Sequence, residues 1–206
     1  MKSFSLRPYI ALLITVGLAA CGGKATYDVS GTITGLSNSG LVLVNGSDTL
    51  SVPAGATSFT FANKIDYGTS YNIVVQTPPA HMNCTVSGGS DTAGHYVSIQ
   101  ANVSCQQNVY TVGGTITGLT VDGLVLSNGS NSSPLTVSKN PGADPLAFTM
   151  PTAVPDGTSF GISVTTSPAG LVCSVLNNPT TGLSTGVGIM GAAAVTSVQI
   201  ACNPAS

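Results

Sequence analysis

The sequence predicts an all-β protein in which two tandem antiparallel β-sandwich domains follow a cleaved N-terminal signal peptide. Three observations lead to this prediction: one sequence pattern occurs twice, apolar residues alternate with polar ones, and helix-forming residues are scarce. Only 6% of the 206 residues are charged, and the chain contains no Glu. Thr, Ser, Val and Gly dominate instead, so neither a helical bundle nor an α/β enzyme with amphipathic crossover helices is expected.

The first 20 residues are predicted to be a signal peptide rather than part of the fold. Lys2 and Arg7 give the segment a positive start, and an apolar run from Tyr9 to Ala20 follows. A helix of about 12 residues spans about 18 Å. This is shorter than the hydrocarbon core of a bilayer, which is about 30 Å thick, so the run is not expected to be a stable membrane span.

The apolar run ends in Leu18-Ala19-Ala20-Cys21, which resembles the lipobox of bacterial lipoproteins. The resemblance implies that the chain is cut before Cys21, that the thiol and the new amino group of Cys21 are acylated, and that residues 21–26 form a lipidated tether. In that family an Asp after the cysteine favours retention in the inner membrane. Gly22 stands there instead, so outer-membrane delivery is expected. An ordinary secretory signal that is cut nearby is the alternative.

Removal of residues 1–20 makes the chain more acidic. Three Lys remain against seven Asp, which gives a net charge of 3 − 7 = −4, and no Arg remains. No basic surface is available to hold a phosphate backbone, so nucleic-acid binding is not expected. Anionic headgroups would not attract this chain either, so the membrane is expected to be a partner only through the lipid on Cys21.

The internal repeat divides the rest of the chain into two domains. Residues 27–36 recur as residues 110–119, and further matches follow up to the last cysteine of each copy. The offset between the copies grows only between apolar runs, which is where loops vary. We therefore expect repeat 1 to span residues 27–107 and repeat 2 to span residues 108–206, joined by a linker of about three residues that allows a semi-rigid end-to-end arrangement.

Each repeat carries the period of two that is typical of half-buried antiparallel strands. The last strand of repeat 1, for example, is expected to place Val97, Ile99, Ala101, Val103 and Cys105 on its inner face. Asn-Gly pairs mark tight turns. Seven short strands in about 80 to 95 residues predict a small β-sandwich. The pattern resembles the immunoglobulin-like or prealbumin-like modules of bacterial surface proteins, and it does not separate these two topologies.

Four cysteines remain besides Cys21, two in each repeat at matching positions. Four cysteines allow three pairings, and the repeat favours Cys84–Cys105 and Cys173–Cys202, each closed within its own domain. The strand phase places all four side chains inward. A zinc site and a redox pair are the alternatives, but the chain has no CxxC motif and no histidine at metal-ligand spacing from a cysteine.

The sequence offers little chemistry beyond these cysteines. His81 and His95 both lie in predicted loops of repeat 1, and neither recurs in repeat 2. No nucleophile elbow, calcium loop or repeated carboxylate pair is present. We therefore expect no enzyme activity, no cofactor and no metal, although a triad assembled in space from His81 or His95 is an alternative that the sequence leaves open.

Two features could bind a partner. The loop aromatics His81, Tyr67 and Tyr96 of repeat 1 could stack on a sugar ring, which would make the protein a glycan-binding or other ligand-binding module. The segment 176–194 of repeat 2 carries Leu183, Val187, Ile189 and Met190 among glycines. We expect these four side chains to pack on their own domain in an extra hairpin, and the alternative is that they form a contact site.

The expected function is that of an exported, membrane-anchored lipoprotein that serves as a structural, spacer or adhesion module at the bacterial cell envelope. The partner, a protein or a glycan, is not identified by the sequence. The expected location is the outer membrane, on a face that the sequence does not specify.

Overall fold

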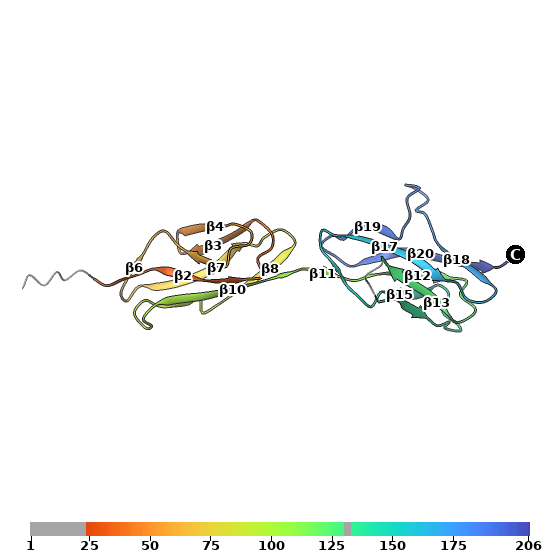
Figure 1. The fold of residues 1–206 in the computed structure, drawn as a ribbon, viewed down its shortest axis with the longest axis horizontal. Helices are drawn as coiled ribbons and strands as arrows, with labels where there is room; N and C mark the ends of the chain where they lie inside the picture. The colour runs from red at the N-terminus through yellow and green to blue at the C-terminus, as the bar shows by residue number, and fades with distance from the viewer. Residues whose placement is uncertain (1–23, 130–132) are drawn as a thin grey trace, which may run out of the picture.

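Alternation of apolar and polar residues produces two sandwiches, one from each repeat, that follow one another end to end (Figure 1). The structure is a computed structural model that describes residues 24–129 and 133–206. The expected all-β class and the two β-sandwich domains are confirmed. Within the two described ranges, no helix is long and apolar enough to cross a membrane. The signal peptide and Cys21 lie outside the described residues.

Repeat 1 has two four-stranded sheets and one short strand pair. The first sheet has the order β5 (Ser58–Thr60), β2 (Val29–Thr34), β10 (Ile99–Gln107), β8 (Met82–Ser87). The second has the order β4 (Asp48–Val52), β3 (Leu41–Asn45), β7 (Ser70–Thr77), β9 (Ser90–Thr92). The short pair is β1 (Thr26–Tyr27) with β6 (Ile65–Asp66).

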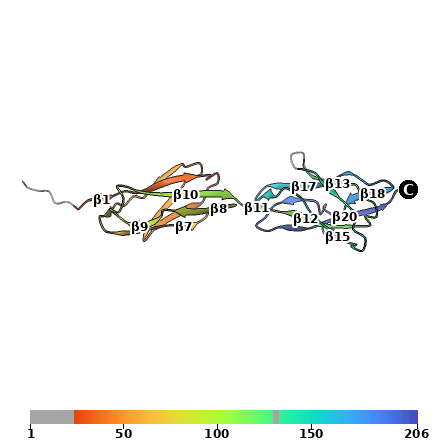
Figure 2. The same cartoon turned by 90° about the horizontal axis from the view of Figure 1, so that it is seen from below.

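Repeat 2 has the same arrangement. Its first sheet has the order β15 (Leu146–Thr149), β12 (Val112–Thr117), β20 (Val195–Pro204), β18 (Leu171–Val175). Its second sheet has the order β14 (Leu135–Val137), β13 (Leu124–Asn128), β17 (Ser159–Thr166), β19 (Val187–Ile189). The short pair is β11 (Val109–Tyr110) with β16 (Val154–Pro155). The view turned by 90° shows the strands of both domains running along the long axis (Figure 2).

The strand order differs from that of an immunoglobulin constant domain, where the first two strands pair in one sheet. Here β2 and β3 lie in different sheets. β2 instead lies parallel to β10, the last strand of its repeat, and β12 lies parallel to β20. The five other pairings that build the two main sheets of repeat 1 are antiparallel.

The central parallel pair explains a glycine that both repeats share. A Cβ atom on Gly31 would overlap the carbonyl oxygen of Ala101, and one on Gly114 would overlap the carbonyl oxygen of Val198. Neither glycine has a positive φ, so the requirement is one of space alone. The repeated Gly-Thr-Ile-Thr segment therefore lets two backbones approach closely in the middle of each sheet.

Each domain has its own core. Most of the residues predicted to face inward in repeat 1 are buried, including Val29, Ile33, Leu43 and Val103, and none of the residues in its core cluster comes from repeat 2. Repeat 2 buries the matching set around Val112, Ile116 and Leu126. Two separate cores mean that each sandwich can be stabilised or weakened independently of the other.

The structure corrects two strand predictions. Val97 is not on the inner face of the last strand, because β10 begins only at Ile99 and the Val97 side chain is 99% exposed. Within residues 24–129 and 133–206, each repeat also has ten strands rather than seven. The additional ones are pieces of two or three residues, such as β6 and β9, which are too short to produce a readable alternation.

Candidate interaction surfaces and the interdomain joint

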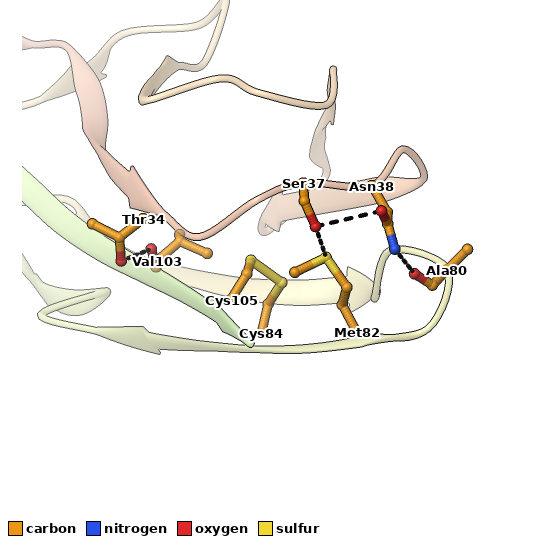
Figure 3. The surroundings of a disulfide bond; sticks show 8 residues. All are labelled: Thr34, Ser37, Asn38, Ala80, Met82, Cys84, Val103 and Cys105. Carbon is orange, nitrogen blue, oxygen red and sulfur yellow. Dashed lines mark hydrogen bonds between the residues drawn. A yellow bond between two sulfur atoms is a disulfide. The ribbon is translucent and has the colours of Figure 1, made fainter. Parts of the chain in front are cut away.

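Both predicted disulfides are present, Cys84–Cys105 and Cys173–Cys202. In each pair the two cysteines are direct cross-strand neighbours on adjacent antiparallel strands, and all four side chains are buried. Figure 3 shows the first bond beside Met82, whose sulfur accepts a hydrogen bond from the Ser37 hydroxyl at 3.4 Å. Each bond therefore joins two strands within the core of its own domain.

The loop after β2 is tied to the turn that precedes β8. The side-chain amide of Asn38 donates a hydrogen bond of 2.7 Å to the carbonyl oxygen of Ala80 (Figure 3). The turn itself contains His81, whose φ of 62° is the only positive value among the described non-glycine residues. Histidine adopts this left-handed conformation more readily than most residues. Its side chain points at repeat 2.

His81 contacts the buried carboxylate of Asp156, at the start of the turn before β17. The His81 Nδ1 atom lies 3.1 Å from Oδ1 of Asp156, and the Asp156 side chain is only 7% exposed. The imidazole ring also lies over Gly157, where an added Cβ atom would be 3.0 Å from it. Within the described ranges Asp156 is the only buried charged side chain. A buried carboxylate needs such a partner, because its desolvation is otherwise costly.

Three further hydrogen bonds hold the same place. The side-chain amide of Gln107 donates to the carbonyl oxygen of Asp156 at 2.9 Å. The N–H of Asp156 donates to the carbonyl oxygen of Asn108, and the N–H of Asn108 donates to the carbonyl oxygen of His81. Asn108 is the one residue between β10 and β11. We call the contacts among His81, Gln107, Asn108 and Asp156 the interdomain joint.

Sequence reasoning missed the joint, although the repeat contained a signal for it. His81 stands where repeat 2 has Gly170, and Asp156 stands where repeat 1 has Tyr67. Both positions are therefore departures from the internal symmetry. His81 and Asp156 contact each other at the boundary between the two repeats. Residues that differ between the copies of a tandem repeat are therefore candidates for the contact between those copies.

A second histidine pair lies in repeat 1. The Nδ1 atom of His95 is 2.8 Å from Oδ2 of Asp91, and the His95 and Tyr96 ring centroids are 4.5 Å apart. The hydrogen bond from His95, followed by one from the Thr92 N–H, holds the pKa of Asp91 below its ordinary value. Burial, and next the charge of Asp91, raises the pKa of Tyr71.

We expect His95→Ala to raise the pKa of Asp91, because it removes the largest cause of the depression. The folded-state pKa of Asp91 lies below its unfolded value, so the stabilisation by this pair is present above the unfolded pKa and is lost as the pH falls through the folded pKa. Carboxyl carbon NMR titration measures the shift. His81→Ala is the matched control and should leave the titration of Asp91 unchanged. An unchanged Asp91 titration in His95→Ala would contradict the assignment.

The aromatic set predicted for sugar stacking is divided, because His81 lies apart from Tyr67 and Tyr96. His81 is engaged at the interdomain joint. Tyr67 follows β6 at the other end of repeat 1, next to Gly94. Tyr96 lines a groove of about 550 Å³ together with Tyr71, Asp91 and Gln100. The sequence could not distinguish these positions, because all three residues occur in loops.

The apolar side chains of segment 176–194 do not share one environment: one is buried in repeat 2 and three are exposed. Met190 is packed in the core of repeat 2 and is 1% exposed. Leu183, Val187 and Ile189 are exposed, so the prediction that all four pack on their own domain is wrong for these three. Residues 187–189 form the edge strand β19, and Asn177 bridges Ser184 at the base of a hairpin. Apolar side chains in an edge strand remain exposed when no further strand covers them.

The described residues offer few side-chain arrangements that could bind a metal ion or catalyse a reaction. Among residues 24–129 and 133–206, no group of three or more His, Cys, Asp or Glu side chains could hold a metal ion. In the same ranges, no serine or threonine hydroxyl is hydrogen-bonded to the ring of His81 or His95. An aspartate that orients a histidine is present twice, and in a hydrolase such a pair would act on a neighbouring nucleophile.

Comparison with known proteins adds no family. No protein-family model matches the chain, and no significant match is found among the curated proteins or the solved structures.

Proposed function

We propose that the protein is an exported lipoprotein, acylated on Cys21, whose two sandwiches form a spacer or adhesion module of the bacterial cell envelope. The observation that carries the proposal is the interdomain joint. It fixes the second sandwich on the first through a buried carboxylate and three hydrogen bonds. Relative motion is the default between two domains of one chain, and a module that holds its far end away from its attachment point needs contacts that restrain this motion.

The position of β1 supports the same proposal. Lys24 precedes β1, which lies at the end of repeat 1 that is remote from repeat 2 (Figure 1). An anchor on Cys21 would thus attach one tip of the molecule to the membrane, while the far end of repeat 2 would lie farthest from it. The Gly22 residue after Cys21 favours the outer membrane as the location.

Cys21→Ser is expected to abolish acylation and to release the protein from membranes. Two or more acyl chains give stable anchoring, whereas the remaining chain carries only Lys24, Lys64 and Lys139 as cationic side chains. Membrane fractionation after a high-salt wash, together with intact mass measurement, tests this. Lys24→Ser is the matched control and should remain in the membrane fraction. Retention of the Cys21→Ser protein would place the anchor elsewhere.

A glycan-binding role is the second candidate, and the groove beside Tyr96 is the observation that favours it. The exposed Tyr96 ring offers a stacking surface, and the Asp91 carboxylate that lines the same groove has the chemistry to accept hydrogen bonds from sugar hydroxyl groups. This role is tested by titration with peptidoglycan fragments and envelope polysaccharides, with the NMR signals of Tyr96 as the readout of binding. Binding that survives Tyr96→Ala would exclude the groove as the site.

A further inference from the structure

The edge strand β19 differs chemically from its counterpart in repeat 1. Both strands occupy the same place: β9 pairs with β7 as β19 pairs with β17. Ser90, Asp91 and Thr92 of β9 correspond to Val187, Gly188 and Ile189 of β19. Charged and polar residues on an edge strand discourage pairing with other chains. Repeat 1 has this protection and repeat 2 lacks it.

The backbone of β19 has unused hydrogen-bonding groups that face outward. Met190 donates to the carbonyl oxygen of Thr158, and Ile162 donates to that of Gly186. In an antiparallel ladder these contacts recur at every second residue. Gly188 therefore points its backbone groups at β17, while Val187 and Ile189 point theirs away from the sheet. No further strand pairs with β19 in the described parts of the chain.

The side chains on this edge are apolar and exposed. Val187 is 56% exposed and Ile189 is 73% exposed. Both line a groove of about 330 Å³ together with Leu183 of the neighbouring hairpin. No Asp, Glu, Lys, Arg or His occurs anywhere between residues 157 and 206. The net negative charge of the chain therefore resides elsewhere, and two copies of this edge would meet without local repulsion between like-charged side chains.

We propose that β19 pairs antiparallel with β19 of a second copy of this chain. Gly188 would face Gly188 of the second copy at the two-fold axis, and Val187 would face Ile189 on either side. The outward N–H and C=O groups of Val187 and Ile189 then form two hydrogen-bonded pairs, four hydrogen bonds in all. A second copy is the natural occupant because a two-fold axis makes this edge complementary to itself.

The pairing also determines the orientation of the two molecules. The strands run along the long axis of the molecule, and β1 lies at the tip that is remote from repeat 2 (Figure 2). Antiparallel pairing of β19 therefore directs the two N-terminal tips in opposite directions. This step rests on the proposed acylation of Cys21. With each N-terminal tip anchored, the dimer joins two membranes that face each other, rather than two molecules anchored in the same membrane.

The pairing itself is tested on the Cys21→Ser chain by sedimentation equilibrium, which does not depend on membrane attachment. The expected result is a weight-average mass that rises with concentration toward that of a dimer. The double variant Val187→Asp with Ile189→Asp should remain monomeric at every concentration. Ser90→Asp with Thr92→Asp, at the corresponding positions of β9, is the matched control and should still dimerise. Circular dichroism melting checks that all variants are folded.

Disulfide cross-linking tests the register. A mixture of the Val187→Cys and Ile189→Cys chains should form linked dimers faster than either variant does separately, because only the mixture places two new cysteines opposite each other. A Cys21→Ser chain that stays monomeric overturns the proposal. Dimerisation of the double aspartate variant also overturns it. Equally fast cross-linking of the mixture and of each cysteine variant by itself overturns the proposed register. Failure of these experiments leaves the anchoring test on Cys21 unaffected, so the two proposals can fail separately.

Discussion

Replacing both cysteines of one repeat, Cys84→Ala with Cys105→Ala, should lower the free energy of unfolding of repeat 1 by about 3 to 4 kcal/mol. The bond closes a loop with a sequence separation of 21 residues, and the estimate is the chain entropy that such a loop regains in the unfolded state. Small domains are stable by only about 5 to 15 kcal/mol, so repeat 1 should melt well before repeat 2.

Calorimetry combined with hydrogen exchange assigns the loss to one domain. Amides of the repeat 1 core, such as those of Val29 and Val103, should lose protection, while those of Val112 and Ile116 should keep it, because the two cores are separate. Cys173→Ala with Cys202→Ala is the matched variant and should give the reverse pattern. An equal loss of protection in both repeats would show that the domains unfold as one unit.

Gly114→Ala should lower the free energy of unfolding of repeat 2 by about 2 to 3 kcal/mol, which is the cost expected when a methyl group is forced into a well-packed site. The new Cβ atom would overlap the carbonyl oxygen of Val198 on the parallel partner strand. A backbone atom cannot rotate away as the end of a side chain can, so β12 and β20 must separate. Urea denaturation of the two proteins measures the difference.

Gly161→Ala is the control for this substitution. Gly161 lies in β17 of the same repeat and has no positive φ. A Cβ atom added to Gly161 would have no other atom within 4 Å. We expect Gly161→Ala to be neutral or slightly stabilising, because alanine restricts the unfolded chain. Similar losses in the two variants would mean that strand glycines matter through backbone entropy rather than through the close approach of β12 and β20.

The main strands and the disulfides could be predicted because each depends on a signal that is local or repeated. Alternation in segments such as 29–34 shows which side chains face the core, and the matching cysteine positions remove two of three pairings. The parallel pairing of β2 with β10 could not be predicted in this way. Residues 29 and 99 are far apart in the chain, and alternation identifies the inner face of a strand but not its neighbours.

The candidate sites were harder to predict, since they depend on contacts between distant loops. His81 and Tyr96 look alike in the sequence, but one lies at the interdomain joint and the other lines an open groove. Met190 and Ile189 are adjacent in an apolar run and have opposite environments, because alternate residues of β19 and its extension face opposite sides. A strand of only three residues, such as β19, is too short for the alternation in its sequence to show which residue is buried.

Residual dipolar couplings of the Cys21→Ser chain test the joined two-domain architecture most directly. If the interdomain joint holds the sandwiches as one body, couplings from both repeats fit a single alignment tensor. His81→Asn removes the imidazole while keeping a residue that tolerates the positive φ, and should produce two tensors of different magnitude. Two unequal tensors in the chain with His81 intact would contradict the account, because the repeats would then move independently and could not set a fixed distance.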